Sequence, residues 1–484
     1  MKSPWVRAGG IVGVVLMMFG CGASPAVIRD VRARQAAAAR SQLGETGSAS
    51  GGPDTTAVGG GQSAGQPAGQ PGVVAPGPAG GNPSVAGAAR AAGSSTSSTA
   101  PRVALNAPCG AQAPAGGNGG TTDTGVDAST IKIGGTFFNG NYLDKYSQVT
   151  ENAAKAYFQY VNDQGGICGR KIDYVTCDTA GTADGTQGCL SKLADQDKVF
   201  IMGPSLDFNL DTVQQSLATH KLPWVGDSGL YPAEFNSPWM FPTQIPGLNV
   251  GALIATYAGQ TLHVKKAGIS YLNEVAGPDC TRRAQQVAQK LGYDASTTAS
   301  NGFVEAGLDN QVSTLKSAGV DSVLFCNDPV NTIKFIQAAQ RVGWKPTFVG
   351  GFVAADDVPQ AAGSFAAGMY GFTAFDFYNA TTPGIEEYRK ITEYYYPTTF
   401  HHFYEQAAYI GAEAIVDALR KTGPNLTRST FLAALRSMTN YDTGMGLRLN
   451  FANISASPTT SGLMLQADSN LAWHVITGRF APAA

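Results

Sequence analysis

From residue 126 to the C-terminus, short apolar runs alternate with segments of helical periodicity, and this alternation restricts the folds open to the chain. The runs 131–138 and 171–177 combine isoleucine, valine and aromatic residues, as buried strands do. After the first of them, apolar residues recur at helical spacing over 149–161. Strands that alternate with helices across short loops favour parallel sheets of the α/β class.

The alternation occurs in two blocks, so we predict two α/β units. The first block adds short buried strands at 199–203 and 222–226. The second has strands at 267–272, 321–326 and 347–352, with helices over 280–291 and 331–342. The blocks meet at "FPTQIPG" (241–247), where two prolines and a glycine predict a crossover.

The N-terminal part of the chain has a different composition. From 44 to 125 it consists mainly of Gly, Ala, Ser, Pro and Thr, with few large apolar residues. Such a segment cannot bury a core and is expected to be disordered. We therefore predict a flexible tether over 21–125 that holds the globular part away from whatever anchors the N-terminus.

The first 20 residues have the features of an export signal. Lys2 and Arg7 precede an apolar run at 8–19, which is too short for a bilayer core that requires ~20 residues. The run ends in "MMFGC", which resembles a bacterial lipobox, in which the cysteine is lipidated and becomes the first residue. We predict a lipoprotein signal peptide over 1–20 and lipidation at Cys21; an ordinary secretory signal and a short uncleaved anchor are the alternatives.

Cysteine usage and charge narrow the class further. Besides Cys21 the chain has six cysteines, an even number that suggests three disulfides in an exported protein, and the sequence alone leaves their pairing open. No cysteine pair has CxxC spacing, and we predict neither a metal nor a cofactor. The formal net charge of -2 excludes the basic field that recruits nucleic acid.

Several motifs resemble type I periplasmic solute-binding proteins, in particular the branched-chain amino acid-binding group that serves ABC importers. They are "VNDQGGICGRKI" (161–172), "FIQAAQRVGWKPTFVGGF" (335–352) and "FYEQAAYIGAEAIVDALRKTG" (403–423). The resemblance extends from 126 to about Phe480. It rests on the order and spacing of the motifs together, since no single one is diagnostic.

The resemblance implies two Rossmann-like lobes with parallel sheets, joined by three hinge crossovers at 243–247, 377–380 and 444–449. Lobe one would comprise 126–244 and 379–445, and lobe two 245–378 and 446–484. The ligand would bind in the cleft between them. The resemblance also implies a disulfide between Cys177 and Cys189. We pair Cys280 with Cys326 too, which leaves Cys109 with Cys168.

"GDSG" (226–229) spells the sequence around a protease nucleophile, so Ser228 is tested first as a catalytic residue. A serine nucleophile needs a histidine base in reach. Only His220 precedes Ser228, and the α/β pattern does not suit a barrel of antiparallel strands. The adjacent His401 and His402 would point to different faces of a helix and cannot easily share a metal, so they are interpreted as surface and packing residues. We predict that the protein is not an enzyme.

Ligands of open α/β sheets bind at the carboxyl ends of the strands. This rule, together with the resemblance, places Ser228 in a cleft loop; the alternative is a hydroxyl that caps a turn and does not contact ligand. The predicted ligand-binding residues are Phe138, Asn141, Tyr142, Ser205, Asp207, Asp227, Ser228, Leu230, Tyr231, Asn273, Glu274, Asn327, Phe352 and Tyr404.

The predicted cleft departs from that of the amino-acid binders in two respects. Phe352 stands where those proteins place a carboxylate for the ligand ammonium, and Ser205 replaces a run of serines and threonines. Aromatic side chains dominate instead, and aromatic faces stack on planar or apolar ligands. A small organic solute other than an amino acid is therefore preferred, with an amino acid as the alternative.

These observations predict a monomeric, exported solute-binding protein that is held by lipid on the outer face of the cytoplasmic membrane. It would capture a small organic solute between its lobes and deliver it to the permease of an ABC importer. The alternative is a ligand-sensing ectodomain that signals through a partner receptor.

Overall fold

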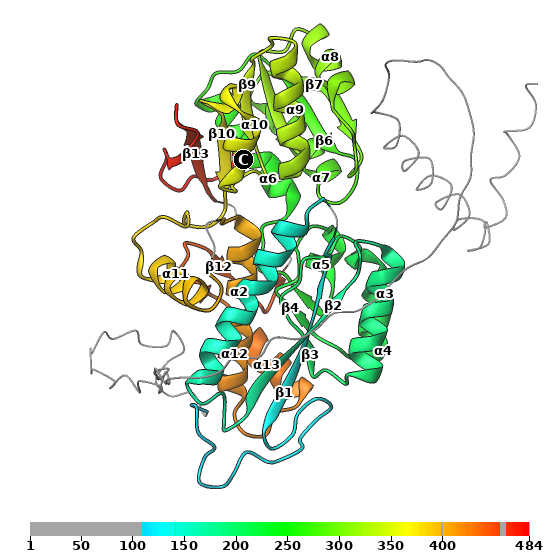
Figure 1. The fold of residues 1–484 in the computed structure, drawn as a ribbon, viewed down its shortest axis with the longest axis vertical. Helices are drawn as coiled ribbons and strands as arrows, with labels where there is room; N and C mark the ends of the chain where they lie inside the picture. Colours follow the sequence, from blue (N-terminus) through cyan, green and yellow to red (C-terminus); the bar gives the residue numbers. More distant parts are fainter. Residues whose placement is uncertain (1–108, 141, 398–399, 455–460, 484) are drawn as a thin grey trace, which may run out of the picture. The chain divides into compact units, whose positions relative to one another are not determined.

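The computed structural model describes residues 109–140, 142–397, 400–454 and 461–483, all within one compact unit of the chain. The predicted signal peptide, Cys21 and the tether up to residue 108 lie outside the described residues. The described part contains two sheets with helices packed on them (Figure 1). We call the five-stranded sheet with its helices lobe one, and the seven-stranded sheet with its helices lobe two.

Lobe one has a parallel sheet in the order β2-β1-β3-β4-β5. Its strands are β1 (Thr130–Phe137), β2 (Lys171–Asp178), β3 (Ile201–Met202), β4 (Trp224–Val225) and β5 (Met240–Phe241). Its helices are α2 (Asp144–Asp163), α3 (Ala183–Ser191), η1 (Lys192–Gln196), η2 (Leu210–Val213), α4 (Gln214–His220), α5 (Pro232–Asn236), α11 (Pro383–Tyr395), α12 (Phe403–Thr422) and α13 (Arg428–Arg436).

Lobe two has the strand order β14-β13-β10-β9-β8-β6-β7. Its strands are β6 (Lys266–Leu272), β7 (Asp294–Asn301), β8 (Ser322–Cys326), β9 (Thr347–Gly350), β10 (Tyr370–Thr373), β13 (Leu463–Ala467) and β14 (Trp473–Val475). Its helices are α6 (Gly247–Gln260), α7 (Gly277–Lys290), α8 (Asp309–Ser317), α9 (Pro329–Arg341), α10 (Asp357–Ala362) and η3 (Ser364–Ala366).

The central strands are apolar because helices cover both faces of a parallel sheet. All five residues of β8 are buried, and Ile131, Ile133 and Phe137 of β1 are almost fully buried. Long helices cover these strands, and α12 of lobe one is buried along most of its length against α2. The predicted α/β class with two lobes is confirmed.

Two of the strands that were not expected, β7 and β14, lie at the edges of the lobe-two sheet. The strand β7 was not expected, because "DASTTASN" has no apolar run, and it is an edge strand that needs few apolar residues. The hairpin β13–β14 was not expected either, and it adds two antiparallel strands to the other edge of the sheet. Edge strands with one exposed side carry a weak sequence signal.

The third crossover lies further along the chain than predicted. Residues 448–451 were assigned to lobe two, but β12 (Arg448–Leu449) pairs with β11 (Tyr441–Asp442). The ring of the buried Phe451 packs at 6.5 Å from that of Phe241, which belongs to lobe one. The chain therefore leaves lobe one after Phe451, because burial of this ring holds the segment there.

The predicted tether also extends too far. Residues 109–125 are held against lobe one, where Arg170 donates hydrogen bonds to the carbonyl oxygens of Asn118 and Gly120. The backbone N–H of Cys168 donates to the carbonyl oxygen of Gly110 at 2.8 Å. This segment has few apolar side chains, so a buried arginine and backbone hydrogen bonds, rather than a core of its own, keep it in place.

The disulfide pairs are as expected. Cys109 is bonded to Cys168, Cys177 to Cys189 and Cys280 to Cys326. The first joins the end of the tether to lobe one, the second joins β2 to α3, and the third joins α7 to β8. The third pair lies directly beneath the cleft, because Cys326 ends β8 and also lines a pocket there.

Candidate ligand-binding cleft

A pocket lies between the two lobes and encloses about 330 Å³ of space, part of it open to solvent. Phe208, Leu230 and Tyr404 line it from lobe one. The remaining lining residues belong to lobe two and are Leu272, Val275, Ala276, Gly277, Phe303, Cys326, Asn327, Asp328 and Phe352. Most of them directly follow a strand, so the pocket lies at the carboxyl ends of the strands of both sheets, as the rule for α/β sheets requires.

Aromatic rings connect the lobes across this pocket. Phe138, at the end of β1, lies with its ring centroid 4.6 Å from that of Phe208. Phe208 is stacked on Phe303 of lobe two, with centroids 5.2 Å apart and planes 10° apart. Phe303 also lies 6.0 Å from the ring of Tyr142. The cleft wall is therefore a continuous series of aromatic faces.

The polar lining residues on the lobe-two side are already bonded to other protein groups. The side chain of Asn327 bonds to Asn301 at 2.6 Å and to Ser270 at 3.3 Å. Asp328 is the N-cap of α9 and accepts hydrogen bonds from the backbone and side-chain amides of Asn331 at 2.9 and 2.6 Å. Burial raises the pKa of Asp328. These groups shape the pocket floor and have little bonding capacity left for a ligand.

Three predicted ligand-binding residues form hydrogen bonds to other groups of lobe one. Ser205 accepts from the backbone N–H of Thr136 at 3.0 Å and donates to the carbonyl oxygen of Gly203. Asp207 accepts from the hydroxyl of Thr186 at 2.8 and 2.9 Å, and burial raises its pKa. The hydroxyl of Ser228 donates to the carbonyl oxygen of Asp207 at 2.8 Å. All three are buried, and they join β1 and α3 to the loops that follow β3 and β4.

A buried carboxylate holds the "GDSG" loop in its conformation. Glu234 accepts hydrogen bonds from the backbone N–H groups of Gly229, Leu230 and Tyr231 at 2.6, 3.0 and 2.7 Å. The predicted ligand residue Asp227 is fully buried beside it. Burial raises the pKa of Asp227 well above its ordinary value, and the negative charge of Glu234 raises it further. The pair is thus part of the loop's support, and Glu234 was not among the predicted residues.

The other predicted residues have different positions. Leu230, Asn327, Phe352 and Tyr404 line the pocket, whereas Asn273 and Glu274 are exposed. Tyr231 donates its hydroxyl hydrogen to the carbonyl oxygen of Phe208. Asn141 lies outside the described residues. Contact of any of these residues with a ligand stays a prediction.

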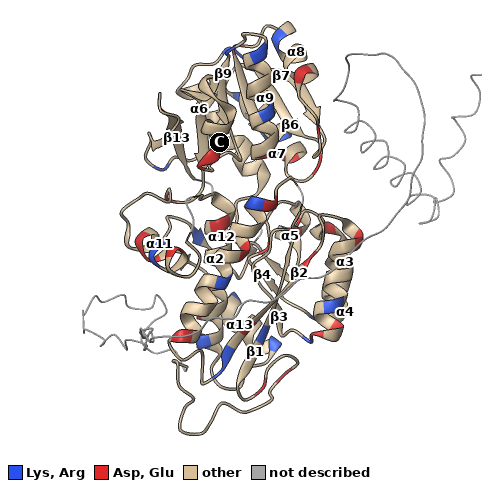
Figure 2. Cartoon of the chain, in the orientation of Figure 1, with Lys and Arg blue, Asp and Glu red and all other residues tan. Residues whose placement is uncertain are grey.

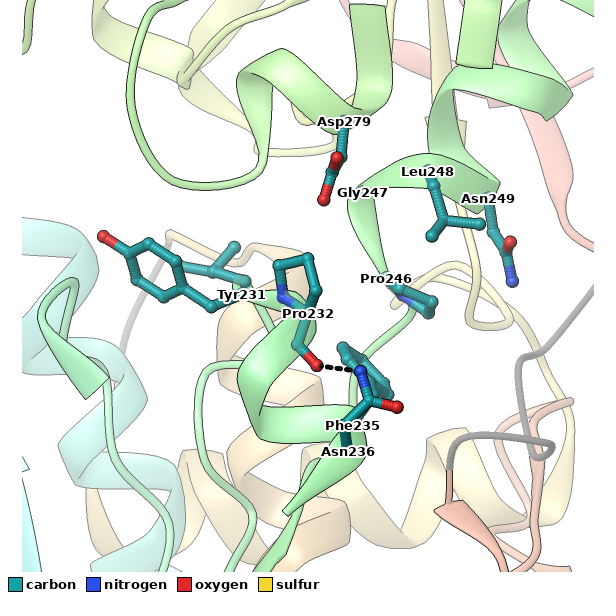
Figure 3. Close-up of a pocket in the computed structure, with 10 residues that line it drawn as sticks. Tyr231, Pro232, Phe235, Asn236, Pro246, Gly247, Leu248, Asn249 and Asp279 are labelled. Atoms are coloured by element: carbon teal, nitrogen blue, oxygen red, sulfur yellow. Dashed lines mark hydrogen bonds between the residues drawn. The ribbon is translucent and has the colours of Figure 1, made fainter. Parts of the chain in front are cut away.

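A second pocket lies beside the first, where the chain crosses from lobe one to lobe two (Figure 3). It contains about 550 Å³ of partly solvent-filled space, and Leu230 belongs to both pockets. In Figure 3 the carboxylate of Asp279, on α7, points toward Pro232 at the start of α5. Pro246 and Gly247, at the crossover, also line this pocket, so its width depends on the angle between the lobes.

The lobes also meet on another side of the cleft. Lys145, at the start of α2, forms an ion pair with Asp357 of lobe two, to which the hydroxyl of Tyr146 donates at 3.1 Å. The backbone of Ala355 pairs with that of His402, next to α12. The two lobes are therefore in contact around the pocket in this structure.

The adjacent histidines are packing residues, but neither is on the surface or within a helix. His402 is the buried N-cap of α12; its Nδ1 accepts from the backbone N–H of Tyr404 at 3.0 Å, and burial lowers its pKa to about 3. His401 precedes it and lies 3.1 Å from a carboxylate oxygen of Glu405, which raises the pKa of His401 despite burial. In the part of the chain that the structure describes, no group of three or more potential ligand side chains could hold a metal ion.

Phe208 and Phe303 were not predicted, although they form the contact between the lobes. Phe208 directly follows the predicted residue Asp207 in the loop after β3, so its position at the carboxyl end of a strand is a signal for it. Phe303 follows β7, whose polar sequence concealed the strand. Recognition of that strand would have placed Phe303 at its carboxyl end.

The comparisons with known proteins agree with this fold. A profile of the family described as "Periplasmic binding protein" matches residues 130–470, well over half of the chain. The chain therefore belongs to the periplasmic binding protein family. This membership confirms the resemblance and the prediction of a binding protein rather than an enzyme.

Among curated proteins, the chain is similar to Leu/Ile/Val-binding protein homolog 7 of Brucella abortus (strain 2308), with 27% identity over 174 residues. The similar protein of Brucella suis biovar 1 (strain 1330) is 26% identical over the same length. Each alignment covers 35% of this chain and 44% of the relative. The chain thus spans less than half the length of the curated relatives it matches.

Solved structures show the same fold at low sequence identity. A fatty acid ABC transporter substrate-binding protein from Thermomonospora curvata has a TM-score of 0.68 and 22% identity, over 76% of this chain and 96% of that one. A branched chain amino acid ABC transporter from Thermus thermophilus with bound valine has a TM-score of 0.66 and 16% identity, over 73% and 97%. A solute binding protein from Rhodopseudomonas palustris BisB5 in complex with 3,4-dihydroxy benzoic acid has a TM-score of 0.64 and 16% identity. The match covers 73% of this chain and 98% of that one.

Proposed function

We propose that this protein captures a small organic solute between its lobes and delivers it to the permease of an ABC importer. The observation that carries the proposal is a pocket whose walls come from both lobes, with Leu230 and Tyr404 on one side and Phe352 and Asn327 on the other. A ligand that contacts both walls stabilises the closed arrangement, because it binds that arrangement better than the open one. The permease would then recognise the closed protein.

The lining supports a ligand other than an α-amino acid. An amino acid brings an ammonium group that requires a free acceptor, and the carboxylate of Asp328 in this pocket is occupied by the amides of Asn331. Phe352 lines the pocket, and the family resemblance implies that the amino-acid binders have a carboxylate at this position. The solutes named for similar structures, a fatty acid, valine and 3,4-dihydroxy benzoic acid, show that related folds accept diverse small organic molecules.

The matched proteins are named for transport, which favours import over the alternative of a sensing ectodomain. Lys, Arg, Asp and Glu are scattered over both lobes (Figure 2). A monomer that contacts its permease transiently fits such a surface. Among the described residues, no helix combines the length and the apolar character that crossing a membrane requires.

The attachment to the membrane belongs to the proposal as well. Cys21 would carry lipid after removal of residues 1–20, and the segment up to residue 108 would tether the lobes to the outer face of the membrane. Replacement Cys21→Ser in the full-length chain should move the protein from the membrane fraction to the soluble extract. Retention in the membrane fraction would contradict lipid anchoring.

The experiment that tests capture is native mass spectrometry of the protein purified without denaturation. We expect a retained small molecule that is released on unfolding in acid and whose mass is not that of a buffer component. A retained leucine or valine would contradict the preference against amino acids but support capture. Absence of bound molecules, together with failure to bind any solute of a broad metabolite panel, would contradict capture.

A further inference from the structure

Two aromatic rings from opposite lobes are stacked on each other in the pocket. Phe208 and Phe303 are both partly buried, line the same pocket and lie almost parallel, with planes 10° apart. Their centroids are 5.2 Å apart, which is within the range at which aromatic rings stack on each other. If the lobes separate by a few ångström, a planar ring fits between them and stacks on both.

The setting of Phe303 indicates a role other than packing within its own lobe. It lies in a loop beyond the end of β7, and its neighbour Val304 is 80% exposed. Its aromatic contacts, Phe208 and Tyr142, both belong to lobe one. A core phenylalanine would contact its own sheet, whereas this ring reaches across the cleft.

The charge of the pocket limits the ligand further. Among its described lining residues there is no lysine, arginine or histidine. The start of α7 supplies no free amide at its first two positions, because Gly277 N–H is donated to the carbonyl oxygen of Glu274 and Pro278 has none. A buried carboxylate without a partner is costly, and a buried ammonium equally so.

One polar group at the cleft has capacity for a ligand. The hydroxyl of Tyr142 is buried and makes no hydrogen bond within the described residues. Burial raises the pKa of Tyr142, so the hydroxyl keeps its proton and is able to donate; the acidic groups that add to the shift include Asp328 and Glu274, both from lobe two. A ligand acceptor that meets this hydroxyl would restore the missing bond.

We propose that the ligand is an uncharged molecule with a planar aromatic ring, which stacks between Phe208 and Phe303 and accepts a hydrogen bond from Tyr142. This inference rests on the proposed function, and it names the ligand class of the same cleft. The ring replaces the direct contact between the lobes with two stacked contacts. Ligand binding and lobe closure are thereby coupled through these two side chains.

The test is isothermal titration calorimetry of the purified chain with matched probes. Benzamide, 4-hydroxybenzamide and indole are planar, whereas cyclohexanecarboxamide has similar size but no aromatic face. We expect at least one planar probe to bind about tenfold more tightly than cyclohexanecarboxamide, and benzoate to bind more weakly than benzamide. Equal affinity for the planar and saturated rings, or tighter binding of benzoate, would overturn the proposal.

Three variants and a control assign the effect to the named residues. Phe208→Leu and Phe303→Leu keep an apolar side chain, and each should lower the affinity for the planar probe about 3- to 10-fold. Tyr142→Phe should lower the affinity for 4-hydroxybenzamide about 5-fold. Phe365→Leu changes a partly buried ring of lobe two that lies outside the pocket lining, and should leave affinity unchanged. Circular dichroism checks that every variant is folded.

The outcomes distinguish this inference from the function on which it rests. If leucine or decanoate binds and no planar probe does, solute capture stands and the ligand class is wrong. If no probe binds and native mass spectrometry finds no retained molecule, both are wrong. If a planar probe binds and its affinity is unaffected by Phe208→Leu and Phe303→Leu, the proposed position of the ring is wrong.

Discussion

The carboxylate of Glu234 accepts a hydrogen bond of 2.6 Å from the backbone N–H of Gly229. This bond and those to Leu230 and Tyr231 hold the loop after β4 in place, so that Leu230 reaches both pockets. The loop that spells a protease motif is therefore organised by a buried acid three residues beyond Tyr231. Its conformation serves the wall of the cleft.

The acid pair in this loop predicts a pH-dependent stability. Burial raises the pKa of Asp227 in the folded protein, whereas in the unfolded chain it titrates near its ordinary value of about 4. Above that pH the folded state binds a proton that the unfolded state has lost. The free energy of unfolding therefore falls as pH rises from about 4, by at most about 1.4 kcal/mol per pH unit.

Asp227→Asn should reduce this slope, because the amide does not titrate, whereas Glu234, whose pKa burial raises to about 7, still does. Urea unfolding between pH 4 and pH 8 measures the effect, and the variant should gain stability relative to wild type as the pH rises. Asp173→Asn changes an exposed carboxylate of β2 and serves as the control. Parallel pH profiles for Asp227→Asn and wild type would show that Asp227 is ionised in the folded protein.

Ser228 should matter for stability and not for chemistry. Its hydroxyl donates a buried hydrogen bond of 2.8 Å to the carbonyl oxygen of Asp207. Ser228→Ala should lower the free energy of unfolding by about 1 kcal/mol. Ser437→Ala, which removes an exposed hydrogen bond to the carbonyl oxygen of Ala434, should cost less. Hydrolysis of a chromogenic ester by wild type that disappears in Ser228→Ala would contradict the role assigned here.

The disulfides should differ in their contribution to stability because they close loops of different length. Cys280 and Cys326 are 46 residues apart, whereas Cys177 and Cys189 are 12 apart. The entropy of the unfolded chain predicts losses of about 4 and about 3 kcal/mol when each pair is replaced by serines. Urea unfolding of the two double variants measures the order. A larger loss from the shorter loop would indicate that packing around Cys177 and Cys189 outweighs chain entropy.

The ion pair between the lobes should favour closure. Asp357 pairs with Lys145 and accepts from the hydroxyl of Tyr146, while Lys145 is about half exposed. Exposed pairs contribute about 0.2–1 kcal/mol, so Asp357→Asn should weaken ligand binding a few-fold and raise the radius of gyration of the ligand-free protein. Small-angle scattering and calorimetry measure these effects. Asp309→Asn, which breaks a pair with Arg341 within lobe two, should change neither.

Much of the fold was predictable because its signals are local. The buried runs that became β1 and β8 are apolar on both faces, and the helices between strands show their periodicity directly. The strands β7 and β14 were missed because an edge strand does not need such a run. The third crossover was misplaced because burial of Phe451 against Phe241 is a contact between residues far apart in the chain.

The candidate site was predictable in its location and only partly in its residues. The rule of strand ends found Leu230, Asn327 and Phe352, since it depends on chain position alone. It could not tell that Ser205 and Ser228 face other protein groups rather than the cleft. That distinction depends on side-chain direction and on which loop packs against which, and neither is encoded in a local pattern.

The sequence by itself determined the α/β class and the division into two lobes, because composition and periodicity act over short segments. Only the tertiary structure decided that Phe208 and Phe303 meet, that Glu234 supports the "GDSG" loop and that residues 109–125 are held by Arg170. These relationships join residues from different elements, and the physical reason is packing. The position that a side chain occupies depends on the residues that pack around it in the folded protein.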